Sequence, residues 1–325
     1  MISTDIHQAA HLLKNDAVIS IPTETVYGLA GNIFSEKAIK SIFNLKKRPL
    51  SNPLIVHIGN ANQLEDLVTQ VPILAKKLME KFWPGSLTLV LPKKDIVPNF
   101  VTGGKDTVAV RMPNHEQTLK LLNLLSFPLA APSANPFSSI SPTKASHVEA
   151  YFGASIPLIL EGGNCQKGIE STIIGFENDT PVLYRLGSIA LEDIEHEIGP
   201  VNIKNFEEHK PMAPGMMAKH YAPKTQTITT DNILESIDFY KNKKVGLLLF
   251  NQIINSENIT HQEVLSFNSD LAEAASNLYA AMHRLDRLNL DIIIAEKFPE
   301  NQLGRSINDR LKRATASTNT SYVFN

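Results

Sequence analysis

Apolar and polar positions alternate along the first 200 residues in a way that predicts strands separated by helices. Apolar residues at helical spacing predict helices over 4–15, from Ser35 to the basic residues before Pro49, and over 61–69, 72–82, 116–125, 143–152 and 191–197. Short apolar runs predict strands at 17–22, 54–58, 87–91, 107–112, 128–132, 157–161, 171–176 and 182–186. Ser3 or Thr4 is expected to cap the first helix. This alternation is typical of an α/β or α+β sheet of at least seven strands, parallel or mixed.

A stretch without periodicity, 203–226, separates this pattern from a second one. Its Pro211, Pro214, Pro223 and Gly215 predict a linker in extended or turn conformation. Beyond it we expect helices near 231–241, 270–289 and 305–314 and strands at 244–250 and 291–296. The second pattern indicates a smaller Rossmann-like α/β unit with a parallel sheet. The sequence therefore predicts two domains, 1–202 and 227–325, joined by the linker.

Composition narrows the classes of protein to which the chain can belong. Its 325 residues fit two domains, and 31 Lys+Arg against 33 Asp+Glu give a formal net charge of -2. This balance argues against a protein that coats nucleic acid, although a local basic pocket for one small anion is compatible with it. Cys165 is the one cysteine, so an internal disulfide and a multi-cysteine zinc site are excluded. Because we find neither a signal peptide nor an apolar run of ~20 residues, we expect a cytoplasmic protein without membrane association.

The common catalytic signatures are absent. Gly103-Gly104-Lys105-Asp106 resembles a phosphate-binding P-loop, but Asn99 stands where the motif needs glycine and Asp106 where it needs Ser or Thr. No G-x-G-x-x-G follows a strand, and no G-x-S-x-G nucleophile elbow occurs. A function must therefore be sought in polar residues outside these motifs.

Polar residues gather where the predicted strands end. Thr25 follows the first strand in the segment Pro22–Leu29, which a capped turn would also explain. Lys46 and Arg48 lie beside Asn52, although cations are common at a helix C-terminus. His57 sits between apolar neighbours, as a core histidine would.

Two arginines lie in otherwise apolar strands. Arg111 in TVAVRMP and Arg185 in VLYRLG need partners there, either a bound carboxylate or phosphate or a structural ion pair. Ser133, Asn135, Ser141 and Ser171 add hydroxyl and amide groups at the ends of other strands; Ser141 could equally cap the helix that follows. Together these side chains predict a cleft at strand ends that binds a carboxylate and several phosphates.

The order of several motifs along the chain indicates a family, which the spacing of polar residues does not. PTETVYGL, KKRP-x-SNPLIVHI, WPGSLTLVL, TVAVRMP, AAPSAN, SPTKA, GIESTII and YRLG occur in this sequence. In this order they resemble the YrdC/Sua5 family, the threonylcarbamoyl-AMP synthases. The linker motif APGM…KHYAP is similar to that of the longer, two-domain Sua5 type. The resemblance implies an N-terminal YrdC-like domain with a twisted mixed α/β sheet around a positively lined cavity.

The resemblance also implies which residues bind each substrate. Those implied for L-threonine are Thr25, His57, Arg111, Ser171 and the backbone of Ala131. Those implied for ATP are Arg48, Asn52, Thr107, Ser133, Asn135, Ser141, Arg185 and the linker residue Tyr221. Lys46, Arg48 and Arg111 are expected to act in catalysis. We expect the linker to fold over the cleft and Tyr221 to close on the nucleotide.

The implied reaction begins with threonine's amine, which forms a carbamate with bicarbonate or CO2. The carbamate oxygen attacks the α-phosphate of ATP and releases pyrophosphate, in a transfer that needs positioning and charge neutralisation. Mg²⁺ is expected to arrive with ATP, without side-chain ligands, and no organic cofactor is expected. The product would pass to the tRNA threonylcarbamoyl transferase machinery for the t6A modification at position 37 of tRNAs that read ANN codons.

Another class of function stays open at this stage. Relatives of the implied fold have been viewed as double-stranded RNA binders, and in that alternative the cavity would hold the backbone of RNA or tRNA without adenylate synthesis. The net charge of -2 weighs against that alternative. The oligomeric state and the role of the C-terminal domain are not indicated by the sequence.

Overall fold

The computed structural model describes residues 1–205, 212–214, 216 and 220–316, which form two compact units. The first unit comprises residues 1–137 and 141–217, and the second comprises 138–140 and 218–325. Parts of the predicted linker, 206–211, 215 and 217–219, lie outside the described residues. The short segment 138–140 is thus grouped with the second unit although the chain on either side of it belongs to the first.

Within the described residues, the first unit is built on one sheet with the strand order β1-β8-β2-β3-β7-β4-β6-β5-β9-β10-β11. The strands are β1 (Ile2–Ser3), β2 (Ile19–Ile21), β3 (Gly28–Asn32), β4 (Ile55–His57), β5 (Leu87–Pro92), β6 (Thr107–Arg111), β7 (Leu129–Ala130), β8 (Ile159–Leu160), β9 (Thr172–Glu177), β10 (Thr180–Arg185) and β11 (Asn202–Ile203). β4 is parallel to β6 and β5 to β9, whereas β5 is antiparallel to β6 and β9 to β10. The mixed sheet implied by the resemblance is confirmed.

Helices cover both faces of this sheet. They are α1 (Ile6–Lys14), α2 (Glu36–Lys46), α3 (Gln63–Leu67), α4 (Ile73–Phe82), α5 (Asn99–Thr102), α6 (Glu116–Asn123), α7 (Ala145–Phe152), the 3-10 turn η1 (Gly153–Ser155) and α8 (Leu191–Ile198). Leu29 and Ala30, adjacent in β3, point to opposite faces of the sheet. Leu29 belongs to the apolar cluster that includes α2, α4 and α8, and Ala30 belongs to the cluster that includes α1 and α6. A buried sheet with cores on both sides explains why its strands read as short apolar runs.

The cap of α1 and a central strand of the sheet differ from the sequence-based expectation. The cap of α1 is Asp5, whose carboxylate accepts from the backbone N–H groups of His7 and Gln8, so the expectation of Ser3 or Thr4 was wrong. The strand β3 was not predicted. Its sequence GLAGN holds two glycines, which disfavour strands, and it is held by pairing with β2 and β7 on either side.

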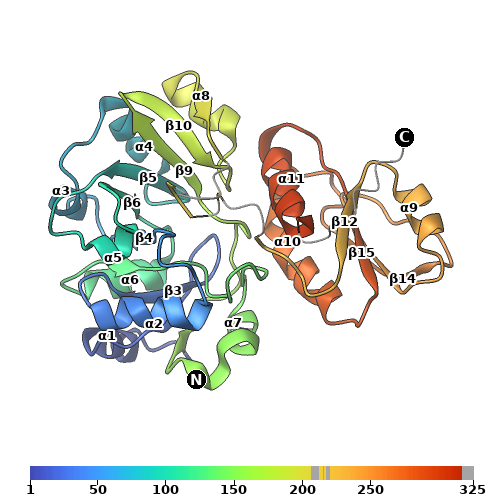
Figure 1. The fold of residues 1–325 in the computed structure, drawn as a ribbon, viewed down its shortest axis with the longest axis horizontal. Helices are drawn as coiled ribbons and strands as arrows, with labels where there is room; N and C mark the ends of the chain where they lie inside the picture. The colour runs from blue at the N-terminus through green and yellow to red at the C-terminus, as the bar shows by residue number, and fades with distance from the viewer. Residues whose placement is uncertain (206–211, 215, 217–219, 317–325) are drawn as a thin grey trace. The chain divides into compact units, whose positions relative to one another are not determined.

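The second unit contains a four-stranded parallel sheet, within the described residues, in the order β12-β15-β13-β14. Its elements are β12 (Thr227–Thr230), α9 (Ile233–Phe239), β13 (Val245–Leu249), β14 (Ile259–Val264), α10 (Leu271–Asp286), β15 (Ile292–Glu296) and α11 (Gln302–Thr315). Figure 1 shows α10 and α11 on one side of this sheet and α9 on the other. The predicted parallel α/β unit is confirmed, although the polar edge strands β12 and β14 were missed. No described helix combines the length and apolarity needed to cross a membrane.

The cap of α2 bears on the candidate site because this helix ends at Lys46. Ser35 accepts a hydrogen bond from the backbone N–H of Ala38 at 3.2 Å, as the sequence predicted. We expect Ser35→Ala to lower the free energy of unfolding by about 1 kcal/mol, since one N-terminal donor loses its partner. Ser41→Ala, in the middle of the same helix, is the control and should be neutral or slightly stabilising. Urea denaturation of both variants measures the difference, and equal stabilities would contradict the assignment of the cap.

Candidate functional site

The end of β6 carries a buried guanidinium with three different partners. Arg111 donates from Nε to the carbonyl oxygen of Gly85 at 3.1 Å and from Nη1 to Thr25 Oγ1 at 2.9 Å. Its Nη2 lies 2.7 Å from Glu24 Oε1, and both side chains of this ion pair are 5 % exposed. Arg111, Thr25 and the carbonyl of Gly85 therefore form one fixed constellation. Glu24 was not among the predicted site residues, although a carboxylate between two threonines after a buried strand was a signal for it.

His57 lies beside Arg111, because the two residues are register partners in the parallel pair β4 and β6. Its Nδ1 lies 3.2 Å from the carbonyl oxygen of Ile55, which can only accept. Burial, and next the positive charge of Arg111, lower the pKa of His57 to about 3. The imidazole is thus neutral at physiological pH and can interact with a ligand through hydrogen bonds without adding charge.

A second arginine is fixed at the end of β10, three strands along the sheet from β6. The register of β10 against β9 shifts between Leu183 and Arg185, and such a bulge re-aims the side chain that follows it. Arg185 donates from Nε and Nη2 to the carbonyl oxygen of Ser171 at 3.0 and 2.9 Å, and from Nη2 to Ser171 Oγ at 2.9 Å. Ser171 Oγ lies 2.7 Å from Thr88 Oγ1. Ser171, predicted for threonine, and Arg185, predicted for ATP, therefore lie in direct contact.

The described part of the linker reaches the same region. The carbonyl oxygen of Pro214 accepts from Arg185 Nη1 at 3.2 Å. Ala213 and Met216 are buried in an apolar cluster with Ile55 of β4 and Ala109 of β6. Since side chains two residues apart in a strand share a face, these contacts place the linker on the face that carries His57 and Arg111.

The helix end at Lys46 organises another part of the site. Lys46 Nζ donates to the carbonyl oxygens of Ser133 and Asn135, so the ammonium group ties the loop after β7 to the end of α2. Burial lowers the pKa of Lys46 well below its usual value; the charge of Arg48 adds to this effect, and that of Glu170 opposes it. Only 1 % of this side chain is exposed, so in the ligand-free protein Lys46 positions backbone and does not face open solvent.

Arg48, Ser141 and the backbone of Ala131 have partners of their own. Arg48 Nη2 donates to Asn52 Oδ1 at 2.6 Å and to the carbonyl oxygen of Pro53 at 2.9 Å. Ser141 Oγ donates to Glu170 Oε1 at 2.6 Å. The backbone N–H of Ala131 donates to the carbonyl oxygen of Ile55 at 3.1 Å, which attaches the end of β7 to β4.

The predicted site residues divide between the two ends of the central strands. Asn52 and Thr107 lie before β4 and at the start of β6, whereas His57 and Arg111 end the same strands. At ~3.3 Å per residue, Thr107 and Arg111 are about 13 Å apart along β6. Asn52 and Thr107, predicted for the nucleotide, thus lie at the opposite end of these strands from His57 and Arg111, predicted for threonine, whereas Arg185, also predicted for ATP, contacts Ser171.

Comparison with known proteins identifies the family. A family model described as telomere recombination, covering Sua5, YciO and YrdC proteins, matches residues 11–187, which is more than half of the chain. The chain belongs to the Sua5/YrdC family. A second model, for the C-terminal domain of threonylcarbamoyl-AMP synthases, matches residues 189–316. The predicted family and its two-domain Sua5 type are confirmed.

Relatives that match over nearly the whole of both chains are named for an enzymatic activity. Threonylcarbamoyl-AMP synthase of Pyrococcus abyssi is 42 % identical over 95 % of this chain and 94 % of its own. The protein of that name from Bacillus subtilis is 41 % identical over 95 % of this chain and 92 % of its own. The crystal structure of P. abyssi Sua5 complexed with L-threonine matches with a TM-score of 0.89 and 40 % identity, covering 95 % of this chain and 94 % of that one.

One residue that the Sua5 resemblance assigned to ATP lies in the second unit. Tyr221 is buried there, with its ring centroid 5.7 Å from that of Tyr279 in a stacked arrangement. The guanidinium of Arg310 lies over the same ring at 4.8 Å from the centroid. The assignment of Tyr221 to the nucleotide stays a prediction.

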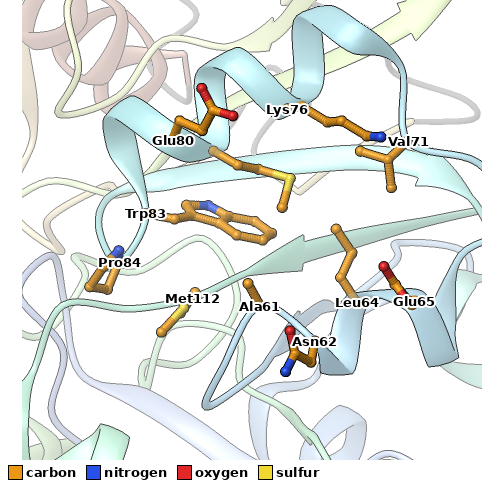
Figure 2. A pocket seen from close by; sticks show the side chains of 11 residues that line it. Ala61, Asn62, Leu64, Glu65, Val71, Lys76, Glu80, Trp83, Pro84 and Met112 are labelled. Atoms are coloured by element: carbon orange, nitrogen blue, oxygen red, sulfur yellow. The ribbon is translucent and has the colours of Figure 1, made fainter.

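A separate cavity of about 470 Å³ borders the arginine site of this Sua5-family protein. Figure 2 shows the Trp83 indole at its centre, with Lys76 and Glu80 of α4 on one side and Leu64 of α3 on the other. None of the predicted site residues lines it. Its wall residues Pro84 and Met112 are chain neighbours of Gly85 and Arg111, but neither Gly85 nor Arg111 lines the cavity.

Burial of His57 predicts a pH dependence of stability. The unfolded chain binds a proton here below pH ~6.5, whereas the folded protein does so only near pH 3. Stability is therefore fully present above pH ~6.5 and falls as the pH drops through this window, by up to about 1.4 kcal/mol per pH unit. His57→Asn keeps a donor near Ile55 but removes the titrating group. When the pH drops from ~6 to ~5, we expect the free energy of unfolding of this variant to fall by about 1 kcal/mol less than that of the unchanged protein. Urea denaturation at both pH values measures this, and parallel losses would refute a neutral, buried His57.

Proposed function

We propose that the chain is a nucleotidyltransferase that converts L-threonine, bicarbonate or CO2, and ATP into threonylcarbamoyl-AMP and pyrophosphate. The observation that carries the proposal is the buried guanidinium of Arg111, fixed beside Thr25 and His57 on the sheet face whose other end holds Asn52 and Thr107. Family membership, the name shared by relatives of full length and a threonine-bound structural neighbour support the same reaction.

At the threonine end, Arg111 would bind the amino acid's carboxylate. A guanidinium already oriented by a carbonyl and a hydroxyl loses little conformational freedom when a planar carboxylate arrives. The neutral imidazole of His57 and the hydroxyls of Thr25 and Ser171 can hydrogen-bond the substrate's remaining polar groups. The backbone of Ala131, at the end of β7, completes the proposed threonine set.

At the nucleotide end, the protein's task is to neutralise charge. The carbamate oxygen would attack the α-phosphate and pyrophosphate would leave, a transfer that needs positioning and no protein nucleophile. Arg48 at this end and Arg185, which reaches the phosphates from its contact with Ser171 of the threonine set, would offset the phosphate charge. Asn52, Thr107, Ser133 and Ser141 would supply hydrogen bonds. Lys46 would act on this step by holding the Ser133–Asn135 loop, and its cation lies close enough to Arg48 for their charges to interact.

Mg²⁺ would enter this site together with ATP. Among the described residues, no three or more His, Cys, Asp or Glu side chains gather in a group that could hold a metal ion. Phosphate oxygens and water suit Mg²⁺ better than a protein cage does, so the ion would accompany the triphosphate and screen its charge. The product would then be consumed in the cytoplasm by the transferase machinery that makes t6A at position 37 of tRNA.

The alternative of an RNA-binding module fits the site less well. Arg48, Arg111, Arg185 and Lys46 are all buried, with at most 7 % of each residue exposed. A duplex backbone is contacted by exposed Lys and Arg side chains, whereas buried cations can only meet a ligand small enough to enter the site.

The reaction can be tested by measuring pyrophosphate release from ATP, with and without L-threonine and bicarbonate. We expect release to require both, and Arg111→Ala to raise the threonine concentration needed by a factor corresponding to roughly 2–5 kcal/mol, because the carboxylate loses a buried partner. Arg284→Ala removes an exposed ion pair with Glu263 and is the matched control, with no expected effect. Release that ignores threonine in the unchanged protein would refute the proposed function.

A further inference from the structure

The ion pair between Glu24 and Arg111 is incompletely hydrogen-bonded. Arg111 Nη2 and Glu24 Oε1 are 2.7 Å apart, but the geometry is not that of a hydrogen bond. Neither oxygen of Glu24, nor Nη2 of Arg111, has a hydrogen-bond partner among the described residues. A buried ion pair repays its desolvation only when its remaining hydrogen-bonding groups are satisfied. Glu24 can thus still accept hydrogen bonds, and Arg111 Nη2 can still donate them.

The backbone around Glu24 is rigidly held. Thr23 Oγ1 donates to the carbonyl oxygen of Val26 at 2.7 Å and accepts from the N–H groups of Thr25 and Val26 at 3.2 Å. The carbonyl oxygen of Glu24 accepts from the backbone N–H of Lys167 at 2.7 Å. The carboxylate is therefore presented beside Arg111 by a fixed turn, as a preorganised binding group would be.

A ligand that satisfies both ions must carry both charges close together. A simple carboxylic acid would place its negative charge near Glu24, and a simple amine would place its positive charge near Arg111. An α-amino acid in its zwitterionic form carries a carboxylate for Arg111 and, one carbon away, an ammonium group for Glu24. The charge pattern is selective for this class of molecule.

We propose that Glu24 binds the α-ammonium group of the amino-acid substrate and is the first acceptor of the proton that this group must lose. The inference rests on the proposed function, in which the free amine attacks the carbon of CO2. One ammonium proton moves to Glu24, leaving a neutral amine and a carboxylic acid. As the N–C bond forms, a second proton combines with the hydroxide left when bicarbonate yields CO2, giving water and the carbamate. Glu24 returns its proton to solvent before the next turnover.

Two ionisable groups next to this ion pair, His57 and Cys165, keep their charge in the working pH range. His57, which faces Arg111, has its pKa lowered to about 3 by burial and by the Arg111 charge, and so stays neutral. Cys165 interacts with Glu24, Arg111 and Glu161, and burial, followed by the charge of Glu24, raises the pKa of its thiol, which keeps it protonated. Neither His57 nor Cys165 therefore supplies the pH dependence measured below.

The binding test uses Glu24→Gln and two ligands, L-threonine and 3-hydroxybutyrate, which is threonine with hydrogen in place of the amino group. We expect the variant to bind threonine about 30-fold or more weakly, since a buried charged partner is lost, and to bind 3-hydroxybutyrate at least as well as before. Glu161→Gln keeps the acceptor for Tyr27 and is the matched control, with both affinities unchanged. Equal weakening of both ligands by Glu24→Gln would show that Glu24 only orients Arg111, and would overturn the proposal.

The proton transfer has its own measurement, the pH profile of pyrophosphate release at saturating threonine. With Glu24→Gln the amine must lose its proton in solution, so the rate should rise about tenfold per pH unit below the pKa of the free amine. The unchanged protein should show a flatter profile, and profiles of the same shape would overturn the proposal. Failure of the unchanged protein to bind threonine would instead refute the proposed function, so the two failures are distinguishable.

Discussion

Buried cations at the ends of apolar strands are the constraint from which the rest of the site follows. A guanidinium removed from water needs several acceptors, and Arg111 and Arg185 obtain theirs largely from backbone carbonyls and hydroxyls of adjoining loops. The carbonyl of Gly85 must therefore turn toward Arg111, and that of Ser171 toward Arg185. At Gly187 even a methyl group would lie 2.3 Å from the backbone carbon of Ser171, so only glycine allows the chain to pass there. The loops at Gly85 and Ser171 thus have backbone conformations in which their carbonyl groups point toward the two arginines.

Local pattern was sufficient for the elements whose stability is local. The helical spacing and the cap at Ser35 gave α2, and the apolar runs gave β4, β5, β6 and β9. β3 could not be found in this way, because the strands on either side of GLAGN hold it in the sheet and its own propensity opposes it. Likewise β14, with the polar sequence ITHQEV, is an edge strand that pairs with β13 within the described sheet. Both strands form because they pair with other strands, and a single sequence does not show such pairing.

The sequence predicted which residues belong to the candidate site but not how they are placed relative to one another. Cations and hydroxyls beside apolar strands indicated a carboxylate and phosphates, yet the partner of Lys46 is a loop about 90 residues away in sequence. Period-two alternation in Thr107, Ala109 and Arg111 does predict that they share a face. It cannot predict that β4 lies alongside in parallel and brings His57 next to Arg111. Glu24 was overlooked because its neighbours Thr23 and Thr25 were explained equally well as a turn.

The described linker residues have partners within the unit to which each belongs. Ala213 and Met216 pack on the face of the first unit's sheet that carries the site, whereas Tyr221 is held within the second unit by Tyr279 and Arg310. The proposed product is a mixed anhydride of a carbamate and a phosphate, which water would hydrolyse. Such chemistry favours a site from which water is excluded. Ala213 and Met216 contribute to such exclusion within the first unit, because they bury apolar surface against the sheet face that carries His57 and Arg111.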